Sequence, residues 1–302
     1  MQKPKILLLG VNGQVGYELC RKIETIGELI ALERSQADFS HPLKVVEILN
    51  QYQPHIIINA VAYTAVDKAE EEAELAYQVN KETPQEIARY AKKHNCLLIH
   101  YSTDFVFDGL SNSAYVENSQ TAPLSIYGKS KLAGDEAILD SGCASVILRT
   151  SWVYGLRGKN FLLTIRNLAT TKEQLAIVDD QIGSPTWCGF IAQATKDILL
   201  KILHQMDKDF DLSQIPENYL GLFNLSASNS TSWYQFAREL ISLDPNKANH
   251  ICKQILPIPS SDYPTPAHRP EYSVLDNAKI ANIYAIKVPT WEQQLKKCQQ
   301  ND

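Results

Sequence analysis

The sequence has no long apolar run. Its N-terminal run, Ile6–Leu9, is too short for a signal peptide or a membrane span, and no later segment approaches the ~20 apolar residues of a spanning helix. We therefore expect a cytoplasmic protein with no membrane partner.

Cysteine and histidine lack the spacings of a metal site. None of the six cysteines lies within four residues of another, and no two of the seven histidines form an H-x-x-x-H pair. We expect scattered, reduced thiols, and the pattern argues against an enzyme built around a metal.

Basic charge is not in excess. The 29 Lys and Arg residues stand against 34 Asp and Glu, so the net charge is −5, and there is no long basic run. We therefore expect no nucleic-acid partner. The hydrophobic fraction of 44% and the charged fraction of 21% are those of an ordinary globular protein. A chain of 302 residues allows one large domain or two smaller ones.

Short apolar runs alternate with helical periodicity in the first half of the chain. The runs KILLLG, ELIALER, HIIINAVAY and CLLIHYSTD predict strands, and the segments between them have helical spacing. The strands are continuously apolar, which is typical of a parallel sheet covered by helices on both faces. We predict the α/β class, with a Rossmann-type doubly wound parallel sheet.

The alternation weakens after about residue 155. Residues 161–171 and 189–203 predict helices, and residues 221–228 predict one more strand. Residues 204–219 are polar and predict a surface excursion. Residues 257–270 contain five prolines and predict a shaped loop or a boundary, not the interior of an element.

A glycine-rich loop joins the first predicted strand to the first helix. Gly10, Gly13 and Gly16 form a G-x-x-G-x-x-G pattern at this position. Glycine lets the backbone turn tightly and approach a pyrophosphate, and the helix N-terminus then offers free N–H groups. The pattern predicts dinucleotide binding; the alternative is glycine used only for tight packing.

The second predicted strand ends in Glu33 and Arg34, about twenty residues after the glycine loop. In folds of this kind an acid at that position accepts the ribose hydroxyls of NAD, whereas a nearby base accommodates the 2′-phosphate of NADP. Because the sequence offers one of each, both NADH and NADPH remain open.

Polar and small residues follow the next two strands. The segment Asn59–Thr64 follows one strand, and Ser102 and Thr103 end the next. In an open parallel sheet, ligands bind at the carboxyl ends of the strands, so these residues are expected at one site. Helix or turn capping is the alternative for Ser102 and Thr103.

Tyr127 and Lys131 stand four positions apart in the stretch IYGKSKLAGD, so a helix places both on one face. One interpretation is a surface pair on an amphipathic helix. The other is catalytic. A cation ~4 Å from the phenol at an effective dielectric of ~20 supplies ~4 kcal/mol, enough to lower a tyrosine pKa from ~10 to near neutrality. This interpretation predicts that Lys131 lowers the pKa of Tyr127.

Together these motifs resemble the dTDP-4-dehydrorhamnose reductase family, within the extended short-chain dehydrogenases/reductases. The similar stretches run in order from residue 10 to residue 270. They are GVNGQVGYEL, INAVAYTAVDKAE, IHYSTDFVFDG, APLSIYGKSKLAGD, LRTSWVYG, DDQIGSPT and YPTPAHRP.

The resemblance implies hydride transfer from NADPH or NADH to the C4 ketone of a dTDP-6-deoxy-4-hexulose. It implies that Thr103, Tyr127 and Lys131 are the catalytic residues, with Lys131 also holding the nicotinamide ribose. The implied cofactor residues are Gly10, Asn12, Gly13, Gln14, Val15, Gly16, Glu33, Arg34, Asp38, Phe39, Ala60, Val61, Ala62, Thr64, Tyr127 and Lys131. The implied substrate residues are Ser102, Thr103, Trp152, Asn160 and Arg269; Arg269 is assigned to the diphosphate, with a surface-loop arginine as the alternative.

The resemblance also implies a division of the chain. We predict a dinucleotide-binding domain of residues 1–155 plus about 188–228. A smaller, discontinuous C-terminal substrate domain then comprises about 156–187 and 229–302.

Three alternatives stay open at this stage. The chain is also similar to a regulatory subunit of methionine adenosyltransferase, which is a binding module, and to other sugar-nucleotide reductases and epimerases. Related dehydratases are similar but have Thr-Asp-Glu where this chain has Thr103-Asp104-Phe105. The glutamate that would act as base for water elimination is therefore missing, which favours reduction.

Some members of the family form dimers through a magnesium site built from glutamates. Glu18 resembles one of these, but WCGFIAQ, after GSPT, offers no second glutamate. We therefore expect a monomer rather than a magnesium-bridged homodimer.

Overall fold

The computed structural model describes residues 3–206 and 210–300. The other residues, which include the ends of the two predicted domains and part of the polar segment 204–219, lie outside the described residues. Within that segment the structure places two short 3-10 turns, Leu212–Gln214 and Glu217–Tyr219.

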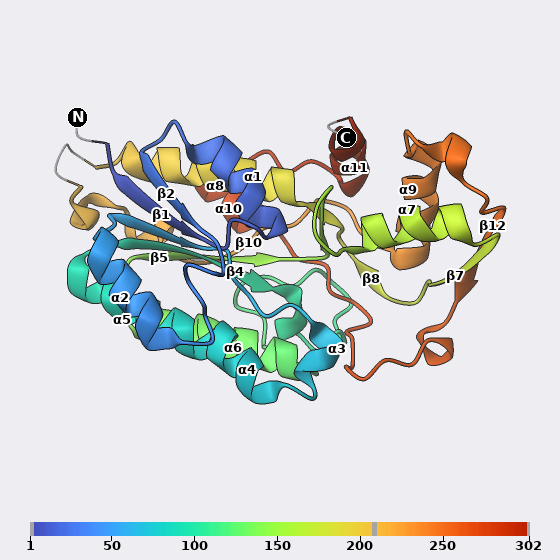
Figure 1. The fold of residues 1–302 in the computed structure, drawn as a ribbon, viewed down its shortest axis with the longest axis horizontal. Coiled ribbons are helices and arrows are strands. Elements are labelled where there is room, and N and C mark those ends of the chain that lie inside the picture. Colours follow the sequence, from blue (N-terminus) through green and yellow to red (C-terminus); the bar gives the residue numbers. More distant parts are fainter. Residues whose placement is uncertain (1–2, 207–209, 301–302) are drawn as a thin grey trace.

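Six parallel strands form the central sheet, in the order β10-β5-β4-β3-β1-β2 (Figure 1). Their bounds are β1 Lys5–Leu9, β2 Glu28–Leu32, β3 Ile56–Asn59, β4 Leu97–Thr103, β5 Ser145–Thr150 and β10 Gly221–Asn224. The strands predicted in KILLLG, ELIALER, HIIINAVAY and CLLIHYSTD are therefore confirmed, with shorter bounds, most of all in HIIINAVAY. The strand predicted at 221–228 forms only over its first four residues.

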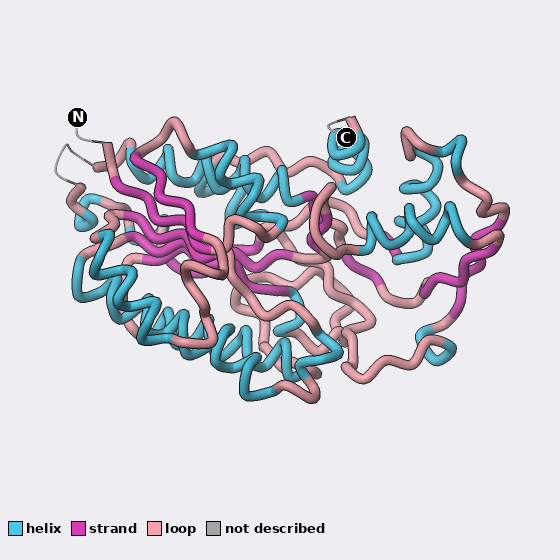
Figure 2. The backbone as a smooth tube through the Cα atoms, viewed as in Figure 1, coloured by secondary structure: helices cyan, strands magenta, loops and turns pink. Residues whose placement is uncertain are grey.

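Helices cover both faces of this sheet, as Figure 2 shows by colour. One face packs against α1, α8 and α10, and the other against α2, α5 and α6. Along β1, Ile6 and Leu8 belong to the first core, whereas Leu7 and Leu9 belong to the second, and all four are fully buried. Each such side chain contributes roughly 2 kcal/mol of transfer free energy. The doubly wound Rossmann-type fold is thus confirmed.

The helices of this part are α1 Gln14–Ile23, α2 Pro42–Tyr52, α3 Val66–Ala69, α4 Ala73–Tyr77, α5 Thr83–His94, α6 Ile126–Asp140, α8 Cys188–Leu203 and α10 Ala278–Tyr284. A π-helical turn, Gln78–Glu82, joins α4 to α5, and a 3-10 turn, Asp104–Val106, follows β4.

A second group of elements lies at the other end of the molecule in Figure 1. Its helices α7 and α9 pack on each other, and β7 pairs in parallel with β12. The bounds here are β6 Val153–Tyr154, α7 Phe161–Thr171, β7 Gln174–Val178, β8 Ile182–Gly183, β9 Thr186–Trp187, β11 Thr231–Ser232, α9 Trp233–Leu243, β12 Gln254–Ile258 and α11 Trp291–Gln299, with 3-10 turns at Lys247–Asn249 and Ser260–Asp262.

One residue of the proline-rich segment lies inside a strand, contrary to the prediction. Pro257 was expected outside any element, but it is the fourth residue of β12. Among the described strands, β12 pairs with β7 alone, so it is an edge strand. Its other side has no partner strand there, so a residue without an N–H is tolerated. The remaining residues, 259–270, form the expected loop with one 3-10 turn.

The strand order reverses between β1 and β3, which are neighbours although α1, β2 and α2 separate them in sequence. The chain leaves β1 and β3 at the same edge of the sheet. Gly10 has a φ of +88°, and a Cβ added there would lie 2.8 Å from Val61. The two loops are therefore in close contact at the switch point, where sheets of this type bind ligands.

Candidate active site

The glycine loop packs tightly on itself. A Cβ at Gly16 would lie 2.1 Å from the carbonyl oxygen of Gly10, so any side chain there would displace the loop. Gly13 is the N-cap of α1 and provides no side-chain cap, which leaves the first N–H groups of the helix to other partners. This is the arrangement that a pyrophosphate needs.

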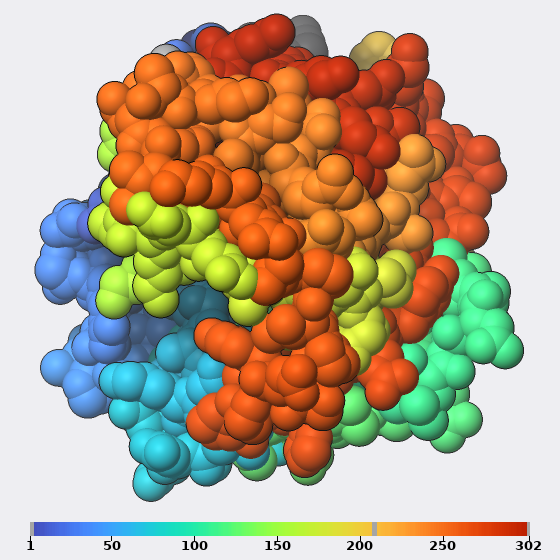
Figure 3. Space-filling model, turned by 90° about the vertical axis from the view of Figure 1, so that its right-hand side faces the viewer, coloured from blue at the N-terminus to red at the C-terminus, as the bar shows by residue number. Residues whose placement is uncertain are grey.

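A hollow of about 530 Å³ lies in front of this loop. In Figure 3 a recess lies beside the cyan segment near residue 70, with yellow-green and orange segments of the other end of the molecule around it. Nine of the predicted cofactor residues line the hollow: Gly10, Asn12, Gly13, Arg34, Asp38, Phe39, Ala60, Val61 and Ala62.

Six further lining residues were missed by the sequence analysis: Tyr63, Ala65, Lys68, Glu72, Leu75 and Val79. Four of them, Lys68, Glu72, Leu75 and Val79, recur at intervals of four, three and four residues, which is the spacing of one helix face. That periodicity through α3, α4 and the π-helical turn was the available signal.

Other predicted cofactor residues do not line the hollow. Val15 packs against the core on the α1 side, and Gly16 packs on Gly10. Thr64 is exposed. Gln14 accepts a hydrogen bond of 2.9 Å from Asn160, so it joins the loop to the other end of the molecule.

Glu33 and Arg34 differ in their contacts and in their position relative to the hollow. The Glu33 carboxylate accepts hydrogen bonds from Ser35 and from Asn12, and these hold its pKa below the usual value. Arg34 lines the hollow, whereas Glu33 does not. The base is therefore nearer to the hollow than the acid.

The start of α6 brings Tyr127 to the end of β4. Ser125 caps the helix by accepting a hydrogen bond of 3.2 Å from the Gly128 N–H. A Cβ at Gly128 would lie 2.3 Å from the Phe105 carbonyl oxygen, so glycine permits this close approach. The rings of Phe105 and Tyr127 meet edge to face at 5.5 Å.

Burial raises the pKa of Tyr127 to about 12, with hydrogen bonding to Thr103 acting in the opposite direction and the charges of Asp104 and Asp135 adding to the rise. The expectation that Lys131 lowers this pKa is not met in this structure, because desolvation raises the pKa and Lys131 is not among the groups that act on the phenol. At neutral pH the phenol therefore carries its proton and lies beside Thr103.

Lys131 is 1% exposed and reaches back to the sheet. Its Nζ donates to the Tyr101 carbonyl oxygen at 2.6 Å and lies 3.1 Å from Nε2 of His100. Burial lowers the pKa of Lys131 to about 8, against the opposing charge of Asp135. The spacing of four places Tyr127 and Lys131 on one helix side, but the lysine chain is long enough to reach β4.

Ser102 is buried at the end of β4. Its hydroxyl donates to Asp135 at 2.5 Å, and Asp135 also lies 3.6 Å from Arg149. In this structure Ser102 thus links β4 to α6.

Asp104 is a second buried carboxyl next to the site, 1% exposed. It accepts hydrogen bonds from Ser151 at 2.8 Å and from Thr103 at 3.1 Å. Burial raises the pKa of Asp104 to about 6. Thr103 also accepts from the Phe105 N–H, so its hydroxyl joins the turn after β4 to the phenol of Tyr127.

Trp152 has an unusual backbone, with φ of +45°. Its indole stacks on Trp233 at 3.5 Å with an interplanar angle of 3°. A Cβ at Gly183 would lie 2.4 Å from the same indole, so the ring is held between Trp233 and the backbone of β8. Trp233 was not predicted, and nothing in its sequence surroundings marks it.

Asn160 and Arg269 both have protein partners. Asn160 caps α7, and its amide also donates to Gln14. Arg269 donates to Asp67 at 2.8 Å and to the Ala267 carbonyl oxygen at 3.2 Å. The predicted diphosphate ligand is thus engaged by a carboxylate of α3.

Among residues 3–206 and 210–300, no three His, Cys, Asp or Glu side chains are grouped as metal ligands would be. Glu18 is therefore not part of such a group there. Nor does any helix in that part of the chain have the length and apolarity to cross a membrane.

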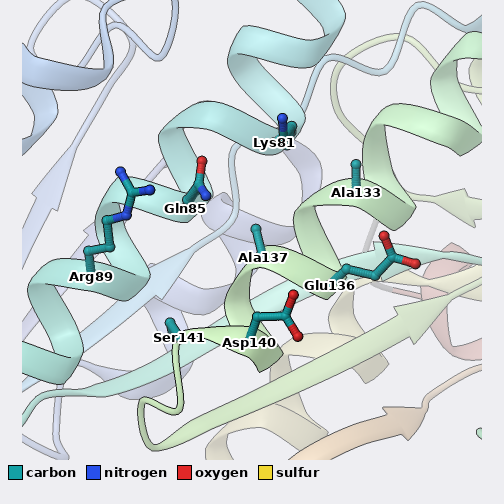
Figure 4. A pocket seen from close by; sticks show the side chains of 8 residues that line it. All are labelled: Lys81, Gln85, Arg89, Ala133, Glu136, Ala137, Asp140 and Ser141. Carbon is teal, nitrogen blue, oxygen red and sulfur yellow. The ribbon is translucent and has the colours of Figure 1, made fainter.

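A second hollow, of about 390 Å³, lies between the π-helical turn with α5 and the C-terminal half of α6 (Figure 4). Its lining is Lys81, Gln85, Arg89, Ala133, Glu136, Ala137, Asp140 and Ser141. None of the predicted site residues is among them, whereas nine of the predicted cofactor residues line the first hollow.

Comparison with known proteins decides the family. The family model described as the RmlD substrate binding domain matches residues 4–302. A dTDP-4-dehydrorhamnose reductase of Burkholderia thailandensis is 38% identical over 297 residues, covering 97% of both chains. The chain belongs to the dTDP-4-dehydrorhamnose reductase family.

Solved structures agree with this membership. A reductase of the family from Bacillus anthracis, solved in complex with NADP, superposes with a TM-score of 0.86 at 29% identity, covering 99% of this chain and 100% of that one. One from Clostridium acetobutylicum gives the same TM-score at 32% identity, covering 98% of this chain and 99% of that one.

Proposed function

We propose that the protein reduces the C4 ketone of dTDP-4-dehydro-L-rhamnose to give dTDP-L-rhamnose, with NADPH or NADH as the hydride source. The observation that carries the proposal is the hollow at the strand-order switch point, with a protonated Tyr127 and Thr103 at the end of β4 in the same fold. Family membership over almost the whole chain supports the same reaction.

The residues present fit a dinucleotide. Glycine at positions 10 and 16 lets the loop fold closely without a clash, and the uncapped start of α1 offers N–H groups to phosphate oxygens. Arg34 and Lys68 are the cations of the hollow, and they favour a 2′-phosphate. A bound nicotinamide supplies the hydride; the protein supplies the orientation and the proton.

In this proposal Tyr127 donates its proton to the oxygen of the ketone as the alkoxide forms. The raised pKa keeps that proton in place at neutral pH. Thr103 orients the same oxygen and shares its developing charge. Lys131 assists as a cation when it is protonated, and it holds the nicotinamide ribose.

For the sugar nucleotide, we propose that Trp152 forms part of the sugar site and that Asn160 orders the segment beside it. We propose one domain of residues 1–155 plus about 188–228 around the parallel sheet, and a second of about 156–187 with 229–302. Helix α10 lies within the second range but packs against the sheet. Residues 1–2, 207–209 and 301–302 of these ranges lie outside the described structure.

The direct test is incubation with dTDP-4-dehydro-L-rhamnose and NADPH or NADH, with the product identified by NMR. We expect oxidation of the cofactor and formation of dTDP-L-rhamnose. Cofactor binding without turnover would support the binding-module alternative, and a C4 epimer as product would support another sugar-nucleotide reductase.

We further propose a monomer that needs no metal. Light scattering in EDTA and in magnesium is expected to give the same mass. A dimer that dissociates on chelation would overturn this part of the proposal and return Glu18 to a metal site.

A further inference from the structure

Three buried side chains, Asn59, His100 and Lys131, form a continuous hydrogen-bonded chain between β3, β4 and α6. Asn59 and His100 stand opposite each other on β3 and β4 and are 1% and 0% exposed. Asn59 Nδ2 lies 3.0 Å from His100 Nδ1, and His100 Nε2 lies 3.1 Å from Lys131 Nζ. The mechanism proposed above uses neither Asn59 nor His100.

The orientation of the Asn59 amide is fixed by a neighbour. The Val61 N–H donates to Asn59 Oδ1 at 3.0 Å, so the oxygen faces Val61 and the NH₂ group faces His100. Nδ1 of His100 must then accept. A neutral imidazole that accepts at Nδ1 carries its hydrogen at Nε2. Burial places the pKa of His100 well below its usual value, so the ring is neutral.

The Nε2–H of this tautomer points at Lys131 Nζ. An ammonium has three donors and no acceptor, whereas a neutral amine has a lone pair. The 3.1 Å contact is therefore a hydrogen bond from His100 to Lys131 only if Lys131 is neutral. The amine then donates one of its own hydrogens to the Tyr101 carbonyl oxygen. A charged Lys131 in this place would need the opposite tautomer, which sets two donors, Nδ1–H and the Asn59 NH₂, 3.0 Å apart.

We infer that His100, fixed as the Nε2–H tautomer by Asn59, is a positioning residue that holds Lys131 as a neutral amine on β4. Lys131 gains its proton only when it leaves His100. The side chain therefore has two positions: on β4 as a neutral amine, and nearer Tyr127 as the ammonium that assists it. This inference rests on the proposed function only for its kinetic consequence.

Other charged groups also act on Lys131 and enter the test. Asp135 on the same helix favours the ammonium, and Arg149 on β5 lies 3.6 Å from that carboxylate. Tyr127 is neutral over the tested pH range because its pKa is about 12, whereas Asp104 titrates near 6. The pH range from 7 to 10 therefore lies above the pKa of Asp104 and below that of the phenol, whereas the pKa of Asp135 is raised by burial.

The first measurement needs no turnover. Long-range ¹H–¹⁵N NMR of the labelled full chain reports the tautomer of each histidine, and His100→Phe assigns the signal. We expect the Nε2–H tautomer of His100 from pH 6 to 8. Asn59→Asp, whose carboxylate accepts from the ring, should reverse it to Nδ1–H. A wild-type His100 that is charged or in the Nδ1–H form overturns the inference.

The second measurement is the pH profile of kcat/KM for the ketone. Activity should fall as pH rises through the Lys131 pKa, near 8 in the wild type. Loss of one hydrogen bond to the neutral amine changes its proton affinity by about tenfold, so both His100→Phe and Asn59→Asp should move the alkaline limb upward by about 1 pH unit.

Thr195→Val is the matched control. It removes a buried 2.8 Å hydrogen bond to the Tyr101 hydroxyl from α8, without touching Lys131, and should leave the limb in place. If neither test variant moves the limb while the wild type turns over, the inference fails. If the wild type shows no turnover but has the Nε2–H tautomer, the proposed function fails and the lysine position stands.

Discussion

Tyr127 shows how burial and hydrogen bonding set the state of one side chain. Its phenol lies beside Thr103 in a site whose desolvation disfavours phenolate, so the pKa rises to about 12. An acid that keeps its proton at neutral pH is a proton donor, which is what ketone reduction requires. The alkaline loss of activity is then assigned to Lys131 and not to Tyr127.

Tyr127→Phe removes that proton with little change in shape. We expect kcat to fall by ~10²–10⁴, the range for general acid catalysis, and the KM for the sugar nucleotide to change little. Tyr90→Phe is the control, because its hydroxyl is also buried but donates to Leu49 O outside the site. A Tyr127→Phe enzyme with near-normal kcat under chemistry-limited conditions removes Tyr127 from the mechanism.

We predict that Glu33 and Arg34 set the preference between NADPH and NADH. The Glu33 carboxylate sits at the edge of the hollow on Asn12, whereas Arg34 lines it. We expect wild type to use both cofactors and Glu33→Ala to raise the NADPH:NADH ratio of kcat/KM by about tenfold, because like-charge repulsion with a 2′-phosphate is relieved. Glu28→Ala, at the far end of β2, should leave the ratio unchanged. An unchanged ratio in Glu33→Ala would place Glu33 away from the ribose.

At the scale of elements, the glycine loop joins β1 to α1 through contacts that only glycine permits. Gly16 sits on the Gly10 carbonyl, but a Cβ at Gly13 would lie 3.3 Å from the same oxygen, a distance that a small shift accommodates. The two positions have the same residue type and different packing.

Gly16→Ala should therefore lower the free energy of unfolding by about 2–3 kcal/mol, as overpacking does, and should weaken cofactor binding as the loop moves. Gly13→Ala should cost less than about 1 kcal/mol. Urea denaturation with calorimetric titration of NADPH compares them. Equal losses of stability would mean that the loop relaxes freely around either Cβ.

At the scale of the whole molecule, the pair Asp67–Arg269 ties α3 to the proline-rich loop, two segments 202 residues apart. The side chains are 40% and 25% exposed, respectively, so solvent screens much of their attraction. The tie is geometric rather than a major source of stability.

A double-mutant cycle of Asp67→Asn and Arg269→Ala should give a coupling of about 0.5–1 kcal/mol in unfolding. The KM for the sugar nucleotide should respond alike to both changes if the tie positions the loop. If Arg269 binds the diphosphate instead, Arg269→Ala should raise KM at least tenfold more than Asp67→Asn does.

The sequence by itself determined the parallel sheet, the glycine loop and the positions of Tyr127 and Lys131. These rest on local patterns: apolar runs such as Ile56–Ile58 are buried on both faces in any parallel sheet, and a helix brings residues four apart to one side. The resemblance of its motifs added the family.

Only the tertiary structure decided the protonation of the site and the partners of its side chains. Lys131 rests on His100 and Tyr101 of β4, Ser102 on Asp135, and Arg269 on Asp67. These contacts join separate elements, and the pKa values follow from burial, so no spacing in the sequence expresses them. The spacing placed a lysine near a tyrosine, but the fold set how far that lysine reaches.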